Sequence, residues 1–421
     1  MNRNEHSSHA RRWASLIALL VTTPVWVGCN FDVVNPGPIL DERLKDPRAQ
    51  EALVNGAGRA LSFALGYVSY TGAVAALELQ GSGNITTMGV TLKQRAGDLA
   101  PEQAETNEHW QYAHTARWVA EESVKRMTEA IGEEFDSSPM AAQALIYVGF
   151  ANRLLGENMC VAVIDGGAAQ PRTVHFERAV AAFTRAVDIA NRADEPDLAL
   201  AARAGRAAAN VWLGDWSAVA SDAEAVPEGF IYSLGYSDIE IDQYNRIFWA
   251  GANSPFRAAT VAGTYFDSYF TATGDPRTPW TTLEGYPTGD GSTIIFHRQM
   301  KYTSRDAPVR LASGREMQTL LAESRLRAGD TPGAVAILNH LRAGVGLPGV
   351  TAATPADGWE LLRRERSAEL WLEGRTLGDV YRWEAGSVPG AHYQDLAGRD
   401  RCFPVGQSEI DTNPEISGEN G

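Results

Sequence analysis

The chain has 421 residues, of which 44% are hydrophobic, so it can bury one large core or two smaller ones. Its 52 Asp and Glu residues outnumber its 37 Lys and Arg residues, which gives a formal net charge of −15. This acidity argues against a nucleic-acid binder, which needs a basic surface, and against simple electrostatic attachment to anionic lipid.

Residues 1–28 have the layout of a secretory signal. Three arginines come before an uncharged apolar run over residues 13–27, which is shorter than the roughly 20 residues of a transmembrane helix. The run ends in Trp26-Val27-Gly28-Cys29, which resembles a bacterial lipobox, although Trp26 stands where a leucine-like residue is usual. We expect Cys29 to become the lipid-modified first residue of the mature chain. The alternative is a plain secreted protein in which Cys29 is an ordinary free cysteine.

Composition predicts how the mature chain is organised. Residues 29–40 include Asn35-Pro36-Gly37-Pro38 and lack a helical period, which indicates an extended tether. Residues 41–421 are expected to form a single, mainly α-helical domain. Within it, an irregular region at about residues 228–311 interrupts the helical pattern.

Helical periodicity begins at residue 41 and continues to about residue 65, and it returns over residues 102–131 and 140–155. Between the first two stretches, residues 79–101 are rich in Gly, Thr, Ser and Asn. Loops of this length in compact domains are often functional, which makes Asn84 a candidate ligand residue.

A repeated helical hairpin is the clearest internal pattern. Residues 176–190 and 198–213 are helical and rich in small residues, and Leu213-Gly214-Asp215-Trp216 matches the turn of tetratricopeptide helix pairs. Ala328-Gly329-Asp330 is a further copy of this turn, and Leu155-Gly156-Glu157 is a weaker one. The repeats are dispersed along the chain, so we expect a helical scaffold with insertions.

The helix expected after Asp357 carries a balanced run of charges, from Arg363 to Glu369. Such a run predicts a solvated or internally paired face, and a ligand site is the alternative. We interpret the charges as structural, holding this helix against its neighbours.

Residues 228–311 have a different character, with many Gly, Pro and aromatic residues. Aromatic faces in irregular segments can stack on sugar rings while neighbouring polar groups bond the hydroxyls. The alternative is that these aromatics anchor the segment to the scaffold. The candidate ligand residues are those beside Gly, Pro or polar residues: Trp249, Trp280, Tyr286 and Tyr302.

Cys160 and Cys402 are the two cysteines other than Cys29, and the exported compartment permits disulfides. A bridge between them is the simplest expectation, and two separately buried thiols are the alternative. A bridge would pin the C-terminal segment to the helical body.

Catalytic and metal-binding signatures are absent from the sequence. It lacks the zinc-protease, nucleophile-elbow, phosphate-loop and Cys-x-x-Cys motifs. His109 and His114 are five residues apart, which does not align them as metal ligands on a helix. Asp238, Glu240 and Asp242 alternate without the spacing of a calcium loop. We therefore expect no enzymatic activity, no metal and no cofactor.

An ordered set of segments resembles the SusD/RagB family of outer-membrane lipoproteins. Each is weak alone, but together they span nearly the whole mature chain in the family's order: Asp32-Val33-Val34-Asn35-Pro36, Glu51–Ala57, Asp275-Pro276-Arg277, Glu316–Ala343, Arg364–Arg375 and Phe403–Pro414. The resemblance implies a helical fold on tetratricopeptide-like pairs, with a less regular region that carries the ligand site.

The resemblance also implies a function. It implies a non-enzymatic, lipid-anchored protein at the cell surface of the outer membrane, which binds nutrients, most often glycans. It implies delivery of the nutrient to a TonB-dependent (SusC-like) transporter. The alternatives are a periplasmic tetratricopeptide-type scaffold that binds only protein and, third, a secreted glycosidase.

Overall fold

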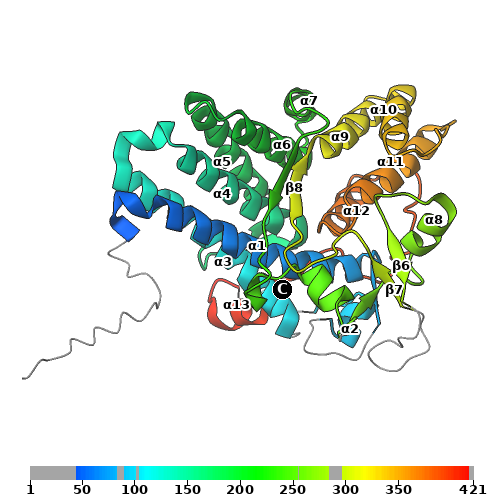
Figure 1. Ribbon diagram of the computed structural model, residues 1–421, viewed down its shortest axis with the longest axis horizontal. Coiled ribbons are helices and arrows are strands. Elements are labelled where there is room, and N and C mark those ends of the chain that lie inside the picture. Colours follow the sequence, from blue (N-terminus) through cyan, green and yellow to red (C-terminus); the bar gives the residue numbers. More distant parts are fainter. Residues whose placement is uncertain (1–43, 83–89, 101–103, 255, 284–295, 417–421) are drawn as a thin grey trace, which may run out of the picture. The chain divides into compact units, whose positions relative to one another are not determined.

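The computed structural model describes residues 44–82, 90–100, 104–254, 256–283 and 296–416. Residues 41–421 form one compact unit, and its described part consists of helices and four short antiparallel ladders (Figure 1). The prediction of a mainly α fold is confirmed. The predicted signal peptide, tether and Cys29 lie outside the described residues. Within the described part of the chain, no helix combines the length and apolar character needed to cross a membrane.

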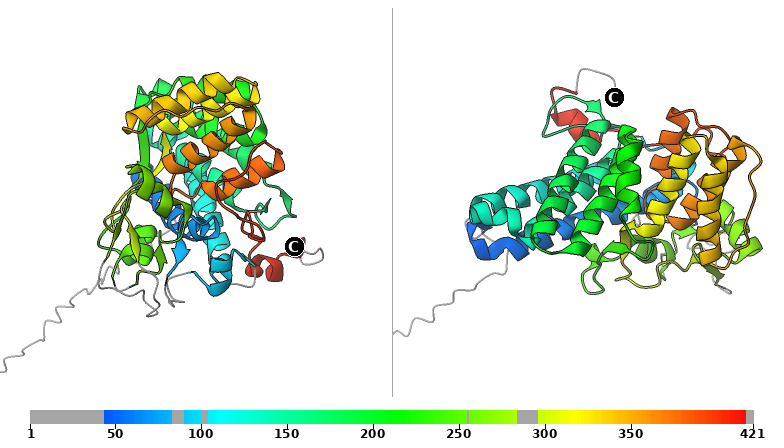
Figure 2. Two further views of the ribbon diagram at one scale, coloured as in Figure 1. Left: turned by 90° about the vertical axis from the view of Figure 1, so that its right-hand side faces the viewer. Right: turned by 90° about the horizontal axis from the view of Figure 1, so that it is seen from above.

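A first group of helices packs in chain order, each against the next long one, so that neighbours form antiparallel pairs (Figures 1 and 2). Their buried faces are rich in alanine, which allows the helix axes to approach closely. The helices are α1 (Gln50–Ala75), α3 (Ala104–Ile131), α4 (Pro139–Asn158), α5 (Thr173–Arg192), α6 (Pro196–Leu213) and α7 (Trp216–Glu224).

Two glycines show how tight this packing is. Gly149 on α4 and Gly205 on α6 both face the buried ring of Phe183 on α5. A Cβ at these positions would lie 2.5 Å and 2.3 Å from ring atoms. Glycine at both places is therefore a packing requirement, because any side chain would displace the ring.

The turn between α6 and α7 has the chemistry expected from its sequence. Gly214 ends α6 with φ +75°, a conformation that favours glycine, and Asp215 caps α7 by accepting a 3.0 Å bond from the Ala218 N–H. Gly329 and Asp330 repeat this arrangement before α10. The N-cap there is Asp330, which accepts a 2.9 Å bond from the Gly333 N–H.

The prediction of a third copy of the turn, at Gly156, is wrong. Helix α4 continues through Gly156 to Asn158. A Cβ on Gly156 would lie 2.7 Å from the ring of Phe176 on α5. This glycine therefore provides space between helices, which the sequence pattern alone does not distinguish from a helix end.

A second group of helices holds its own smaller core around Trp359, Leu338 and Trp383 (Figures 1 and 2). Thr354 caps α11 in a capping box with Asp357, so Asp357 is the third helical residue and not the cap. The helices are α9 (Gly314–Arg327), α10 (Thr331–Gly344), α11 (Pro355–Glu369) and α12 (Thr376–Ala385).

The remaining elements are short, and most belong to the segment between α7 and α9, which is irregular as predicted. The ladders pair β4 (Ile231–Leu234) with β8 (Val309–Ser313), β1 (Gln80–Gly81) with β5 (Ala259–Thr260), β6 (Trp280–Thr282) with β7 (His297–Gln299), and β2 (Val161–Ala162) with β3 (Gln170–Pro171). The short helices are η2 (Pro47–Ala49), α2 (Leu92–Ala96), η4 (Gly132–Ser137), η5 (Ile241–Gln243), η6 (Ile247–Ala252), α8 (Tyr265–Thr273) and α13 (Gln407–Thr412).

Cys160 and Cys402 form a disulfide, which is the pairing favoured from the sequence. The adjacent backbone reinforces it, because the Cys160 N–H donates to the Phe403 carbonyl and the Phe403 N–H donates to the Asn158 carbonyl. Phe403 is fully buried and stacks on His109 at 5.1 Å. The C-terminal segment is thus fixed to the end of α4.

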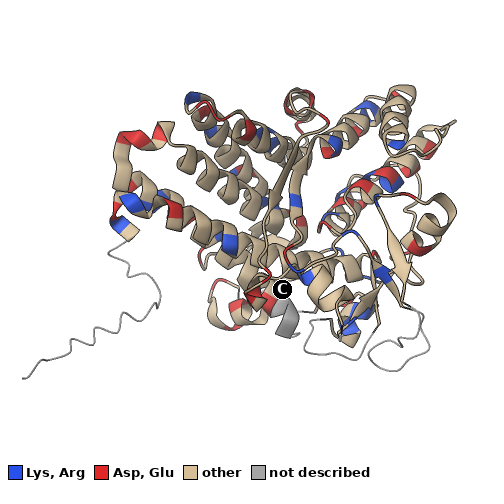
Figure 3. Cartoon of the chain, in the orientation of Figure 1, with Lys and Arg blue, Asp and Glu red and all other residues tan. Residues whose placement is uncertain are grey.

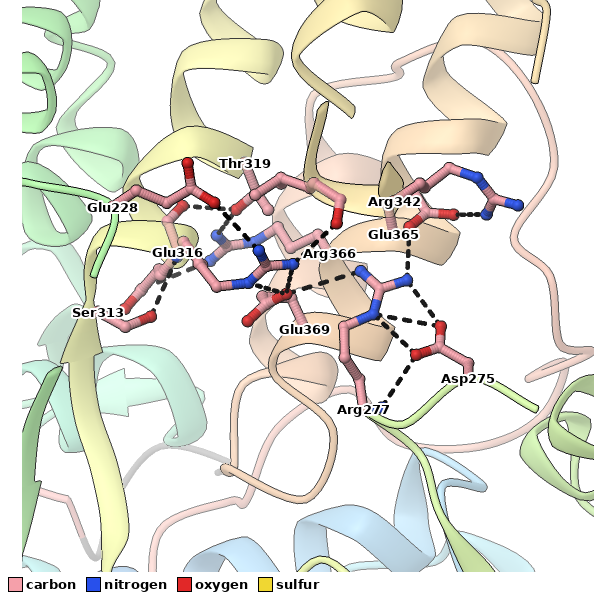
Figure 4. A network of polar contacts seen from close by, with 12 residues as sticks. Glu228, Asp275, Arg277, Ser313, Glu316, Thr319, Arg342, Glu365, Arg366 and Glu369 are labelled. Atoms are coloured by element: carbon pink, nitrogen blue, oxygen red, sulfur yellow. Dashed lines mark hydrogen bonds and ion pairs between the residues drawn. The ribbon is translucent and has the colours of Figure 1, made fainter. Parts of the chain in front are cut away.

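Glu365, Arg366 and Glu369 of α11 are buried and paired within the protein. Along α9, α11 and α12, acidic and basic residues are interspersed (Figure 3). Glu369 is 2% exposed and is contacted by the guanidinium groups of Arg277, Arg310 and Arg315 (Figure 4). Glu365, 1% exposed, pairs with Arg277 and Arg342. These pairs hold the irregular segment and α9 to α11.

Candidate functional site

The predicted ligand residues occupy different environments. Trp249 and Trp280 are half-buried, and Tyr302 is buried. Asn84 and Tyr286 lie outside the described residues. The structure does not bring Trp249, Trp280 and Tyr302 into contact with one another.

Trp249 lies at the centre of a small aromatic group. Tyr244 and Phe256 contact its ring edge-on, with centroids 4.9 Å and 5.0 Å away. The guanidinium of Arg305 lies 4.8 Å from the Trp249 centroid and 4.9 Å from that of Tyr244, within the range of cation–π attraction. The side-chain amide of Asn245 donates a 2.8 Å hydrogen bond to the Ala307 carbonyl. This bond joins the segment that carries Trp249 to the segment that carries Arg305. All four side chains of the group are half-buried, so their faces are held in place and remain partly accessible.

A second aromatic group comes from α1 and α3. Residues 244–246 connect it to the first group along the chain. Phe63, Tyr67 and Tyr112 pack with centroids 4.7 Å to 4.9 Å apart. Arg246 places its guanidinium 3.7 Å from the centre of the Tyr67 ring, and it is two residues from Tyr244. We call the combined set the aromatic surface: Phe63, Tyr67, Tyr112, Tyr244, Trp249 and Phe256, with Arg246 and Arg305.

Trp280 belongs to a different place, the β6–β7 ladder. Its ring stacks on His297 at 3.9 Å with the planes 8° apart. His297 Nδ1 lies 3.0 Å from Asp267 Oδ1, which orients the imidazole. The indole Nε1 of Trp280 is buried without a hydrogen-bond partner among the described residues. Trp280 is therefore a separate candidate for ligand contact.

Tyr302 is a core residue, which corrects the prediction that it contacts a ligand. It is 3% exposed, and its hydroxyl donates to the Leu372 carbonyl at 3.3 Å. Burial raises the pKa of this hydroxyl well above its ordinary value. The polar residues beside Tyr302 in the sequence suggested an exposed ring. The carbonyl that its hydroxyl contacts lies 70 residues later in the chain, and the local sequence does not show such a contact.

Sequence reasoning missed a polar groove of about 390 Å³ between α1 and residues 234–243. Arg59 bridges it by pairing with both Glu240 and Asp242, so the alternating acids noted in the sequence anchor a loop. Hydroxyl, amide and aromatic side chains, two glycines and one leucine make up the rest of the lining: Asn55, Gly58, Ser62, Tyr147, Leu234, Gly235, Tyr236, Ser237 and Gln243. Within the described residues, no group of three or more His, Cys, Asp or Glu is placed to hold a metal ion.

Comparison with known proteins identifies the scaffold. Residues 310–420 match the model of the SusD family. The described fold also matches solved structures of SusD-like proteins. A SusD-like carbohydrate binding protein from Bacteroides vulgatus is 16% identical over 80% of this chain and 83% of that one, with a TM-score of 0.60. A SusD homolog from Bacteroides thetaiotaomicron is 14% identical over 88% and 97%, with a TM-score of 0.65. No curated protein matches.

The chain has a SusD-like fold, and its C-terminal region matches the model of the SusD family. A SusD superfamily protein from Bacteroides thetaiotaomicron, 12% identical, covers 88% of this chain and 98% of its own length with a TM-score of 0.65. The agreement therefore extends well beyond the matched residues 310–420. Those residues contain α9–α13 and much of the buried charge network, including Glu365, Glu369 and Arg342. The aromatic surface lies wholly before them, so the family match supports the SusD-like scaffold and leaves the ligand to be argued from the side chains.

Proposed function

We propose that this SusD-like chain is a non-enzymatic, lipid-anchored protein of the outer cell surface that binds oligosaccharides and delivers them to a TonB-dependent transporter. The observation that carries the proposal is the aromatic surface on a SusD-like fold. A pyranose ring has an apolar C–H face and a polar rim. Half-buried rings offer the complementary flat face, and the guanidinium groups of Arg246 and Arg305 supply donors for hydroxyl oxygens.

Isothermal titration with a panel of neutral and acidic oligosaccharides tests the binding claim. Trp249→Ala should weaken binding about tenfold or more, equivalent to about 1.4 kcal/mol, because it removes the central ring. Trp216→Ala is a matched control: Trp216 is also half-buried, and Arg327 lies 4.5 Å from its ring centre. Trp280→Ala tests the second candidate position. A wild-type chain that binds none of the panel removes the glycan claim.

Delivery to a transporter is tested separately. The full chain, extracted from its native membrane in mild detergent, should co-purify with a large TonB-dependent partner. Surface proteolysis of intact cells distinguishes the periplasmic scaffold, because a chain at the cell surface is cleaved by added protease. Protection from protease, together with absence of the transporter, would favour the scaffold.

A further inference from the structure

The described residues contain a second pocket with an exposed aromatic face. Trp118 on α3 is 55% exposed, and it is the only exposed tryptophan in the part of the chain that the structure describes. His114 lies four residues earlier, so the two side chains share one face of the helix. Both line a pocket of about 250 Å³, close to the lower end of the range for small-molecule sites. An exposed indole beside a pocket is a feature of binding surfaces.

Two carboxylates also line this pocket. Asp165 stands in a tight turn after β2, with φ +51°, and its side chain is 65% exposed. Arg117 donates to Asp165 Oδ1 at 2.7 Å, and this hydrogen bond lowers the pKa of Asp165, so the carboxylate stays charged. Glu409 comes from α13. The pocket therefore combines one flat apolar face with a row of strong hydrogen-bond acceptors.

The walls of the pocket are fixed in place. Asn413 donates from one amide nitrogen to both Glu409 Oε1, at 2.8 Å, and the Gly167 carbonyl, at 3.0 Å. This ties α13 to the turn that carries Asp165. The disulfide between Cys160 and Cys402 holds the same two segments nearby. A site held in this way needs little ordering when a ligand binds, which favours affinity.

His114 also lines the pocket. His114 Nε2 is buried and has no hydrogen-bond partner among the described residues. Burial, and next the charge of Arg117, lower the pKa of His114 to about 3, so the imidazole is neutral and can accept or donate one bond. A buried polar atom without a partner costs free energy unless a ligand or water bonds to it.

We propose that Trp118, Asp165 and Glu409 form a second binding subsite for one ring of a neutral oligosaccharide. The C–H face of the sugar lies on the indole, and its hydroxyls donate to the two carboxylates. The carboxylates repel acidic sugars, and the charge of Arg117 is already shared between Glu121 and Asp165. A single aromatic face lacks the several rings of a cage that binds organic cations. The inference rests on the proposed function, since it assigns the same ligand class to a second place.

The experiment is oxidation of the full chain with N-bromosuccinimide, followed by mass spectrometry of tryptic peptides. Trp118 should react before the other tryptophans of the described residues because they are half-buried or buried. A neutral seven-residue oligosaccharide that binds the wild type should protect Trp118, and the protection should persist in Trp249→Ala. Asp165→Asn should raise the ligand concentration needed for half-maximal protection of Trp118 about tenfold. In the Trp249→Ala background, isothermal titration should show that Trp118→Phe retains the remaining binding, whereas Trp118→Ala abolishes it.

Leu213→Ala, which shortens an apolar side chain of 36% exposure on α6, is the control and should leave protection unchanged. An oligosaccharide that binds the wild type but leaves Trp118 fully reactive overturns the inference alone. Protection of Trp118 by tetramethylammonium and not by sugar also overturns it, as does loss of the transporter complex in Trp118→Ala at unchanged glycan affinity. A wild type that binds no oligosaccharide overturns the proposed function, and this inference with it.

Discussion

Arg277→Ala should unfold the protein at a markedly lower temperature, because Arg277 is one of the cations that the irregular segment contributes to the buried network. It donates to Asp275 and to Glu365 at 2.7 Å each, and it lies 3.6 Å from Glu369. These carboxylates are 0%, 1% and 2% exposed. Removing one partner of a buried pair and leaving the other charge uncompensated typically costs about 3–5 kcal/mol.

The size of the expected change in melting temperature follows from the length of the chain. At about 2 cal/mol/K per residue, a unit of some 380 residues unfolds with an entropy of about 0.8 kcal/mol/K. A loss of about 3–5 kcal/mol therefore lowers the melting temperature by about 4–6 °C, measured by calorimetry or circular dichroism at pH 7. Arg48→Ala, at a residue whose side chain is 90% exposed, is the control and should leave the melting temperature unchanged.

The same variant has a predicted pH dependence. Burial raises the pKa of Asp275, but hydrogen bonds from Arg277 outweigh it, so the folded pKa lies below its ordinary value. A depressed pKa means that the ion pair stabilises the fold above the unfolded pKa and that this contribution is lost as the pH falls through the folded pKa. The difference between wild type and Arg277→Ala should shrink below about pH 4. A melting temperature within 1 °C of wild type at pH 7 would refute the reasoning.

Two further predictions concern buried positions. Burial raises the pKa of Glu78 to about 7, above its unfolded value, so the folded protein favours the neutral carboxyl group. The fold therefore loses about 3 kcal/mol of stability as the pH rises from 4.5 through 7. Glu78→Gln should therefore raise the melting temperature more at pH 8 than at pH 4.5; equal shifts would contradict this. Gly205→Ala should cost about 1–3 kcal/mol in urea unfolding by displacing Phe183, whereas Gly56→Ala, in open space on α1, should be neutral or stabilising. A neutral Gly205→Ala would mean that the ring moves freely.

The helical scaffold was predictable because its signals are local. Spacing of apolar residues identified the long helices, and the Gly-Asp turns before α7 and α10 identified the hairpins. The errors occurred where one residue type serves two purposes. Gly156 looks like a helix end in the sequence, but it makes room for Phe176 inside α4. Only the neighbouring helix reveals which purpose applies.

The candidate site was less predictable because it depends on contacts between distant segments. Tyr302 stands between Lys301 and Thr303, yet it fills the core, whereas Trp249 stands between Phe248 and Ala250 and is half-buried. Arg305 completes the group around Trp249 from a position 56 residues later in the chain. The aromatic surface also takes rings from α1, whose helical pattern in the sequence marked them only as part of an amphipathic helix.

The contacts of the irregular segment separate the demands of folding from those of ligand binding. Arg277 and Lys301 clamp the segment to the second helical group, through Glu365 and Glu373, at 2.7 Å each. Both acids lie in the region that matches the SusD family, and Trp280 lies between the two clamped positions in the sequence. Because the clamp fixes both ends of residues 277–301, the side chain at position 280 can change without removing a buried charge pair. The side chain at this candidate ligand position can therefore vary while the scaffold and its stability are retained, which is consistent with a shared fold at 12–16% sequence identity.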